Sequence, residues 1–108
     1  MYRIGVYIPE TNLEEVKSAL FEAGAGHNGN YDLCSWQTLG KTQFRPLINS
    51  QPVKGKVGEL VQVKEYRLEM ICIDHVLEDV IQALKTFHPY EHPAWDVVRL
   101  VDTSEFHS

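Results

Sequence analysis

The sequence has no hydrophobic run long enough to span a bilayer and no cluster of basic residues. It contains 10 Lys and Arg residues against 15 Asp and Glu residues, which gives a formal net charge of −5. A transmembrane helix needs about 20 consecutive apolar residues, and nucleic-acid binding depends on a basic surface that neutralises phosphates. The sequence therefore argues against a membrane partner and against a nucleic-acid partner.

Cysteine is also scarce. The chain has two, Cys34 and Cys72, each in apolar or aromatic surroundings. Free cysteine is among the most buried residue types, so we expect two buried thiols and no disulfide framework. The N-terminus lacks the basic segment and apolar stretch of a secretory signal. These features predict a cytoplasmic protein.

One pattern occurs twice along the chain. Alternating apolar residues predict strands near 2–8, 33–39, 60–73 and 94–101, and apolar residues at helical spacing predict helices near 12–23 and 76–87. The order β-α-β-β-α-β predicts a single α+β domain over residues 1–102, of the ferredoxin-like type, with a four-stranded antiparallel sheet and two helices on one face. Residues 103–108 are polar and are expected to form a mobile C-terminal tail.

The segment HPYEH at 88–92 has the H-x-x-E-H spacing of a zinc peptidase. That site requires both histidines on one face of a helix. Pro89 disfavours the helical conformation for His88, and Pro93 restricts the residue before it in the same way. The helix must therefore end near Phe87, and the motif lies in an extended loop. The peptidase interpretation is rejected on this ground.

Two loops, one after each helix, concentrate the residues that could bind a ligand. We expect both helix C-termini to lie at the same end of the sheet, which would make these loops neighbours. Neutral imidazoles coordinate divalent cations, and carboxylates complete the coordination shell. The candidate metal ligands are His27, His88, Glu91 and His92, and the candidate ligand-binding residues are Tyr31, Arg45 and Tyr90.

Each of these residues also has a purely structural interpretation. An imidazole at a helix C-terminus, as at His88, can serve only to cap unpaired carbonyls. Tyr90 can be a packing aromatic, and Arg45 an ordinary surface charge. The ligand therefore stays open between a divalent metal ion, an anionic small molecule and none.

Three separated motifs carry a resemblance to a known family. They are AGAGHNGNYDLCSW at 23–36, TQFRPL at 42–47 and HPYEHPAWDV at 88–97. In this order and at compatible spacings, they resemble signatures of the domain inserted in many bacterial members of the Nif-three-like (YqfO) family. The resemblance covers residues 1–102. His92 and Trp95 stand where the family usually has Glu and Tyr.

This resemblance implies more about the chain. The inserted domain is similar to the CutA and PII-type regulators, which are ferredoxin-like domains that assemble as trimers. The flanking family domain, which houses a dinuclear metal centre, does not occur within these 108 residues. The resemblance thus implies a free-standing accessory domain and carries over no hydrolase activity.

Three classes of function remain. The favoured one is a non-enzymatic oligomeric regulatory or binding module for a small ligand or divalent metal, which uses the loops after the two helices. The second is a small acid-base enzyme with an inter-subunit site, where His88 or His27 acts beside Glu91. The third is a purely structural or interaction protein. An enzyme is less favoured because no nucleophile-base pair is legible.

Self-association is expected from the long strand at 60–73. Both of its alternating residue sets contain apolar or aromatic members, so the sheet face without helices should be partly apolar. Burial against a second copy would cover it. The resemblance to CutA and PII-type proteins makes a trimer the first expectation, and a dimer with stacked sheet faces is the second.

Overall fold

The computed structural model describes residues 1–106, and its elements follow the predicted order. The strands and helices are β1 (Tyr2–Pro9), α1 (Leu13–Glu22), β2 (Trp36–Phe44), β3 (Val61–Cys72), α2 (Leu77–Phe87) and β4 (Trp95–Arg99). A short 3₁₀ turn leads into each helix, at Glu10–Asn12 and at Asp74–Val76. The predicted β-α-β-β-α-β arrangement is confirmed.

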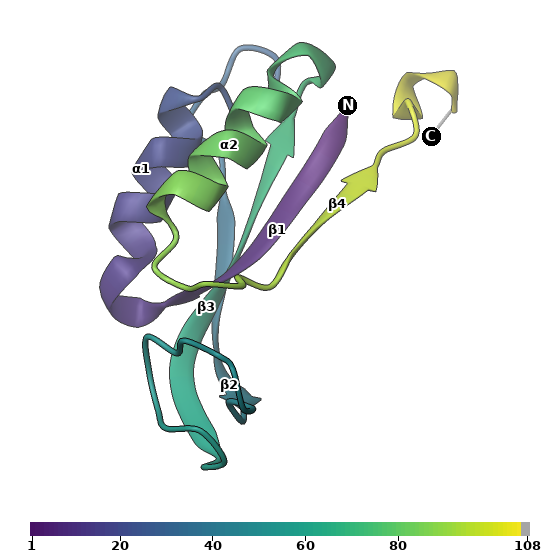
Figure 1. Cartoon of the computed structure of the whole chain (residues 1–108). Helices are drawn as coiled ribbons and strands as arrows, with labels where there is room; N and C mark the ends of the chain where they lie inside the picture. The colour runs from purple at the N-terminus through teal and green to yellow at the C-terminus, as the bar shows by residue number, and fades with distance from the viewer. Residues whose placement is uncertain (107–108) are drawn as a thin grey trace.

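The four strands form one sheet in the order β2-β3-β1-β4, and every neighbouring pair is antiparallel. Both helices lie on the same face of this sheet and pack against each other (Figure 1). Since each helix returns the chain antiparallel to the strand before it, and β1 and β3 are themselves antiparallel, α1 and α2 run in opposite directions (Figure 1). Their C-termini therefore lie at opposite ends of the sheet.

The core lies between the helices and the two central strands. Alternate residues of β1 and β3 point towards the helices, because successive side chains of a strand face opposite ways. The most buried side chains of this layer are Ile4, Val6, Ile8, Val16, Leu20, Leu68, Met70, Cys72, Val80 and Leu84. Cys72 is a buried thiol as predicted, whereas Cys34 is only partly buried.

Strand β2 begins and ends later than predicted. The sequence predicted a strand at 33–39, but Leu33 has a φ of 53°, which takes the backbone out of the extended region before the strand starts. The five residues from Gly40 to Phe44, which lie beyond the predicted strand, also pair with β3, up to the partners Phe44 and Val61. The β2–β3 hairpin consequently projects beyond the helices (Figure 1).

The chain after β4 forms a short 3₁₀ turn at Thr103–Glu105, and the Asp102 carboxylate accepts a hydrogen bond from the backbone N–H of Ser104. The predicted mobile tail at 103–108 includes residues 107–108, which lie outside the described residues, so its mobility stays a prediction. Within residues 1–106, no helix has both the length and the apolar character needed to cross a membrane.

Candidate functional site

A cavity of about 190 Å³ is lined by strand residues such as Tyr7, Thr42 and Glu65, which alternate with the core residues and therefore lie on the sheet face that the helices leave open. Two loops, 45–60 and 88–94, meet over the strands to form it. The walls are mostly apolar. The residues that line it are Tyr7, Thr42, Phe44, Pro46, Ser50, Pro52, Val53, Lys54, Glu65, Tyr90, Glu91, His92 and Ala94.

Three buried oxygens of this lining have no hydrogen-bond partner in the part of the chain that the structure describes. They are Oε2 of Glu65, the hydroxyl of Tyr90 and the hydroxyl of Ser50. Glu65 is only 3% exposed and forms no ion pair with another described residue. Leaving a buried polar group without a partner costs free energy. The cavity therefore contains unused hydrogen-bonding capacity.

Tyr90 is close enough to Glu65 to respond to its charge. Burial raises the pKa of the Tyr90 phenol above its usual value, and the neighbouring Glu65 raises that pKa further. No hydrogen bond of ordinary geometry joins the two side chains, since both oxygens are unpartnered. The ring of Tyr90 also packs at a tilt against Phe44, with the ring centroids 6.3 Å apart. The phenol thus stays protonated, with its hydroxyl beside the Glu65 carboxylate.

His88 holds Tyr90 in this position. The backbone N–H of Tyr90 donates to Nδ1 of His88 at 3.1 Å, so Nε2 carries the proton and donates to the carbonyl oxygen of Tyr7 at 2.7 Å. His88 is 6% exposed, and burial lowers the pKa of its imidazole below the usual value. Both ring nitrogens of this neutral imidazole form hydrogen bonds with backbone groups. His88 therefore has no nitrogen free for a metal or for proton transfer.

Glu91 and His92 lie at the mouth of the cavity. Oε1 of Glu91 accepts a hydrogen bond from the backbone N–H of Gln51 at 3.4 Å, which connects the two covering loops. The same oxygen lies 3.8 Å from Nε2 of His92, whose side chain is 90% exposed. This pair is the polar rim of an otherwise apolar opening.

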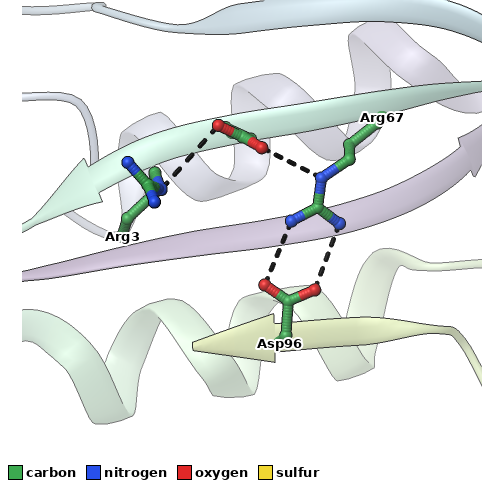
Figure 2. A network of polar contacts seen from close by, with 4 residues as sticks. Arg3, Arg67 and Asp96 are labelled. Atoms are coloured by element: carbon green, nitrogen blue, oxygen red, sulfur yellow. Dashed lines mark hydrogen bonds and ion pairs between the residues drawn. The ribbon is translucent and has the colours of Figure 1, made fainter. Parts of the chain in front are cut away.

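A charge network lies on the open sheet face next to Tyr7, a residue of the cavity lining (Figure 2). Arg67 of β3 donates through two nitrogens to Asp96 of β4, each at 3.1 Å, and through Nε to Glu69 at 2.9 Å; Glu69 also faces Arg3. The bond to Asp96 is the main reason why the pKa of Arg67 is raised. The guanidinium also lies 5.0 Å from the ring centroid of Tyr7, one of the residues that line the cavity.

The structure separates the two loops that were expected to be neighbours. The N–H of Gly26, next to His27, bonds the carbonyl of Ile71 near the end of β3, whereas His88 bonds Tyr7 near the end of β1. Because β1 and β3 are antiparallel, these strand ends lie at opposite ends of the sheet. The expectation of adjacent loops is wrong, since it treated the two central strands as parallel.

The candidate residues divide accordingly. His88, Tyr90, Glu91 and His92 lie together at the cavity end, while His27 and the exposed Tyr31 lie in the loop after α1 at the other end. Arg45 is exposed between two lining residues, Phe44 and Pro46. Among residues 1–106, no three His, Cys, Asp or Glu side chains are grouped so that they could hold a metal ion.

Glu65 and Ser50 were missed by the sequence reasoning. Glu65 belongs to an alternating strand set with Val61 and Val63, and a carboxylate among apolar neighbours was the available signal. Its burial depends on the covering loop 45–60, which sequence periodicity does not place. No comparable signal marks Ser50.

The fold is that of the CutA and PII-like class. The PII-like protein CutA from Nostoc superposes with a TM-score of 0.68 over 99% of this chain and 86% of that one, at 18% identity. At this identity the likeness shows the fold alone. No family model matches the chain.

Sequence similarity points to one particular group with this fold. The chain is 42% identical over 96 residues to a Mycobacterium tuberculosis protein named GTP cyclohydrolase 1 type 2 homolog, a match that covers 89% of this chain and 25% of that protein. A solved Bacillus cereus protein related to NIF3 is 39% identical, with a TM-score of 0.80, over 94% of this chain and 26% of that one. The chain thus spans about a quarter of the length of these relatives. The resemblance to a domain of Nif-three-like proteins is confirmed.

Proposed function

We propose that the chain is a non-enzymatic oligomeric regulatory or binding module that takes a small ligand in the cavity between loops 45–60 and 88–94. The observation that carries this proposal is the set of unpartnered buried oxygens on Glu65, Tyr90 and Ser50. Buried polar groups in folded proteins are nearly always hydrogen bonded, and exceptions mark positions where a partner is missing. A ligand in the cavity would supply that partner.

The occupied nitrogens of His88 favour binding over acid-base catalysis. A general acid or base must reach a substrate proton with a free nitrogen, and His88 directs both of its nitrogens to backbone groups. His27, the other histidine considered for this role, follows Gly26, which bonds Ile71 at the opposite end of the sheet from the loop that holds His88 and Glu91. The enzyme alternative therefore has less support than the binding module.

A divalent metal has weaker support than an organic ligand. Glu91 and His92 are the candidate ligands that remain close together, with 3.8 Å between Oε1 and Nε2. Two exposed side chains would leave most of the coordination shell to water, which gives a weak site. Any metal bound there would be held at the rim and not inside the cavity.

Self-association is the second part of the proposal. The open sheet face and the hairpin carry exposed apolar side chains, among them Trp36, Val98, Leu47 and Ile48. Exposed apolar side chains favour burial against a partner, and in the described sheet strands β2 and β4 each have one edge without a neighbouring strand. A trimer is the first expectation and a dimer the second. The proposal keeps the cytoplasmic location predicted from the sequence.

A ligand screen by thermal shift, followed by calorimetric titration, tests the binding function. The screen should contain divalent metals, nucleotides, small anions, small amines and neutral alcohols. We expect at least one organic compound to raise the melting temperature, because a ligand that binds only the folded state stabilises it. A flat response to every class would contradict the proposal.

A cavity-blocking variant shows where a hit binds. Ala94 is exposed and lines the cavity, so Ala94→Leu should fill part of it and abolish the response. Ser18→Leu is the matched control, since it adds the same side chain to an exposed position of α1 outside the cavity. If both variants respond like the original chain, the ligand binds elsewhere.

A further inference from the structure

We propose that the cavity selects a small organic cation, namely a primary ammonium group on a short hydrocarbon or single-ring body. The inference rests on the proposed binding function and names the class of ligand for the same cavity. Two features carry it: the chemistry of the three unpartnered oxygens and the apolar walls around them.

The charge of the buried carboxylate is the first feature. Glu65 is 97% buried, given its 3% exposure, and no cationic side chain of the described residues pairs with it. Lys54 lines the same cavity but forms no ion pair with it. An unpaired buried charge is costly, and a cation with hydrogen-bond donors offsets that cost best. Glu65 therefore favours a cationic ligand over an anionic one.

The number of donors that the site can use also fits an ammonium group. A primary ammonium has three N–H donors and no acceptor. The residues that line the cavity hold three buried oxygens without partners among the described residues, from Glu65, Tyr90 and Ser50, and each of them can accept a hydrogen bond. A carboxylate or phosphate ligand would bring only acceptors and would face Glu65 with a charge of the same sign. The oxygen set thus matches a donor-only head group.

The apolar walls limit the rest of the ligand. Phe44, Pro46, Pro52 and Val53 present carbon surface to the cavity. Hard divalent cations take about six to eight oxygen ligands, which these walls do not supply. The volume of about 190 Å³ exceeds the roughly 150 Å³ that accommodates benzene. It falls short of the roughly 300–1,000 Å³ of sites for drug-sized ligands, which favours a ligand smaller than a nucleotide.

Three ligands of one shape and different charge test the inference on the unaltered chain. They are benzylamine, benzyl alcohol and benzoate, titrated by calorimetry at pH 7.5. We expect benzylamine to bind about tenfold or more tightly than benzyl alcohol, because hydrogen bonds between charged groups are roughly twice as strong as neutral ones. Benzoate should bind least. Butylamine, which has no ring, should also bind, because it carries the same ammonium group as benzylamine.

Substitutions of the residues that carry the cavity oxygens then show which side chain causes the preference for benzylamine. Glu65→Gln keeps the shape of the side chain and removes its charge, so it should cost benzylamine about tenfold in affinity and leave benzyl alcohol unchanged. Glu59→Gln is the matched control, because Glu59 is exposed in the covering loop and does not line the cavity. Tyr90→Phe should weaken benzylamine by a smaller factor, since it removes one neutral acceptor.

The outcomes separate this inference from the binding function on which it rests. Equal affinity for all three ring compounds, or tighter binding of benzoate, would overturn the cation preference while the cavity stays a binding site. The same holds if Glu65→Gln and Glu59→Gln bind benzylamine equally well. If no compound of any charge binds in the titrations or in the wider screen, both the inference and the binding function fall.

Discussion

At the scale of single residues, His88 connects three parts of the chain. It follows α2, its Nε2–H bonds the Tyr7 carbonyl of β1, and its Nδ1 receives the N–H of Tyr90 in the cavity loop. Pro89 keeps His88 extended, with φ −71° and ψ 135°, and so turns the imidazole away from the helix. The residue that first suggested metal chemistry thus holds the cavity loop to the sheet.

Replacing His88 should lower the stability of the fold. His88→Ala leaves the Tyr7 carbonyl and the Tyr90 N–H without partners, and each unsatisfied buried group costs about 1–3 kcal/mol. We expect the free energy of unfolding, measured by urea denaturation, to fall by about 2–6 kcal/mol. His92→Ala is the control and should change it by less than about 0.5 kcal/mol, because that side chain is exposed. Equal losses in both variants would contradict the role assigned to His88.

The stability of the fold should also depend on the protonation of His88. Burial lowers the pKa of this imidazole in the folded chain, so the unfolded chain binds a proton more readily below the ordinary value of 6.5. The contribution of His88 is therefore complete above pH 6.5 and is lost as the pH falls below it towards the lowered pKa. Urea midpoints at pH 7.5 and 5.5 should fall more for the original chain than for His88→Gln. Parallel changes would show that other groups cause the loss.

At the scale of elements, the loop that follows α1 depends on glycine. Gly26 has a φ of 87°, and a Cβ there would lie 2.9 Å from the Cys34 carbonyl and 2.8 Å from the Phe21 ring. Gly29 also has a positive φ, of 60°, but a Cβ there would meet nothing within 4 Å. Gly26 and Gly29 thus share a left-handed backbone conformation, but only Gly26 has neighbouring atoms that a side chain would overlap.

This difference gives a matched pair of substitutions. Gly29→Ala should cost about 1–2 kcal/mol of stability, which is the strain of a left-handed residue. Gly26→Ala should cost that amount and a further ~1–3 kcal/mol for the steric overlap. Thermal and urea unfolding of both variants measure the two values. Equal destabilisation would mean that the backbone around Cys34 moves freely to admit the methyl group.

The strands and helices that bury one face could be predicted from the sequence, whereas those that are placed by contacts with distant segments could not. Apolar alternation and helical spacing predicted β1, β3 and both helices, because those segments bury one face and carry the corresponding period. β2 is exposed on both faces along most of its length, so its sequence has no alternation of apolar and polar residues to predict it. Its first and last residues are set by pairing with β3. The cavity depends on loop 45–60 folding over Glu65, a contact between distant segments that local patterns do not encode.

At the scale of the whole molecule, the open sheet face has a charged centre and an apolar margin. Arg67, Glu69 and Asp96 pair with one another in the middle, while Trp36 on β2 and Val98 on β4 lie to either side. Burying a charge that is paired costs less free energy than burying a single charge, although desolvation of the pair still costs free energy. An interface through this face would bury the paired charges at its centre and the apolar side chains around them, which is the reverse of the usual apolar core and polar rim.

Two substitutions on one strand test whether this face holds copies of the chain together. Trp36 is 56% exposed on the open face, and Leu39, which is 50% exposed, points to the helix side of the same strand, because residues an odd number apart along a strand face opposite ways. Light scattering at micromolar concentration should give three times the monomer mass for the original chain, or twice that mass as the second expectation. Trp36→Glu should shift the mass to the monomer, since it places an unpaired charge in the contact, and Leu39→Glu should not.

A monomeric original chain would remove the oligomer from the proposal. Dissociation by Leu39→Glu alone would move the contact to the other side of β2, where the helices leave that strand uncovered.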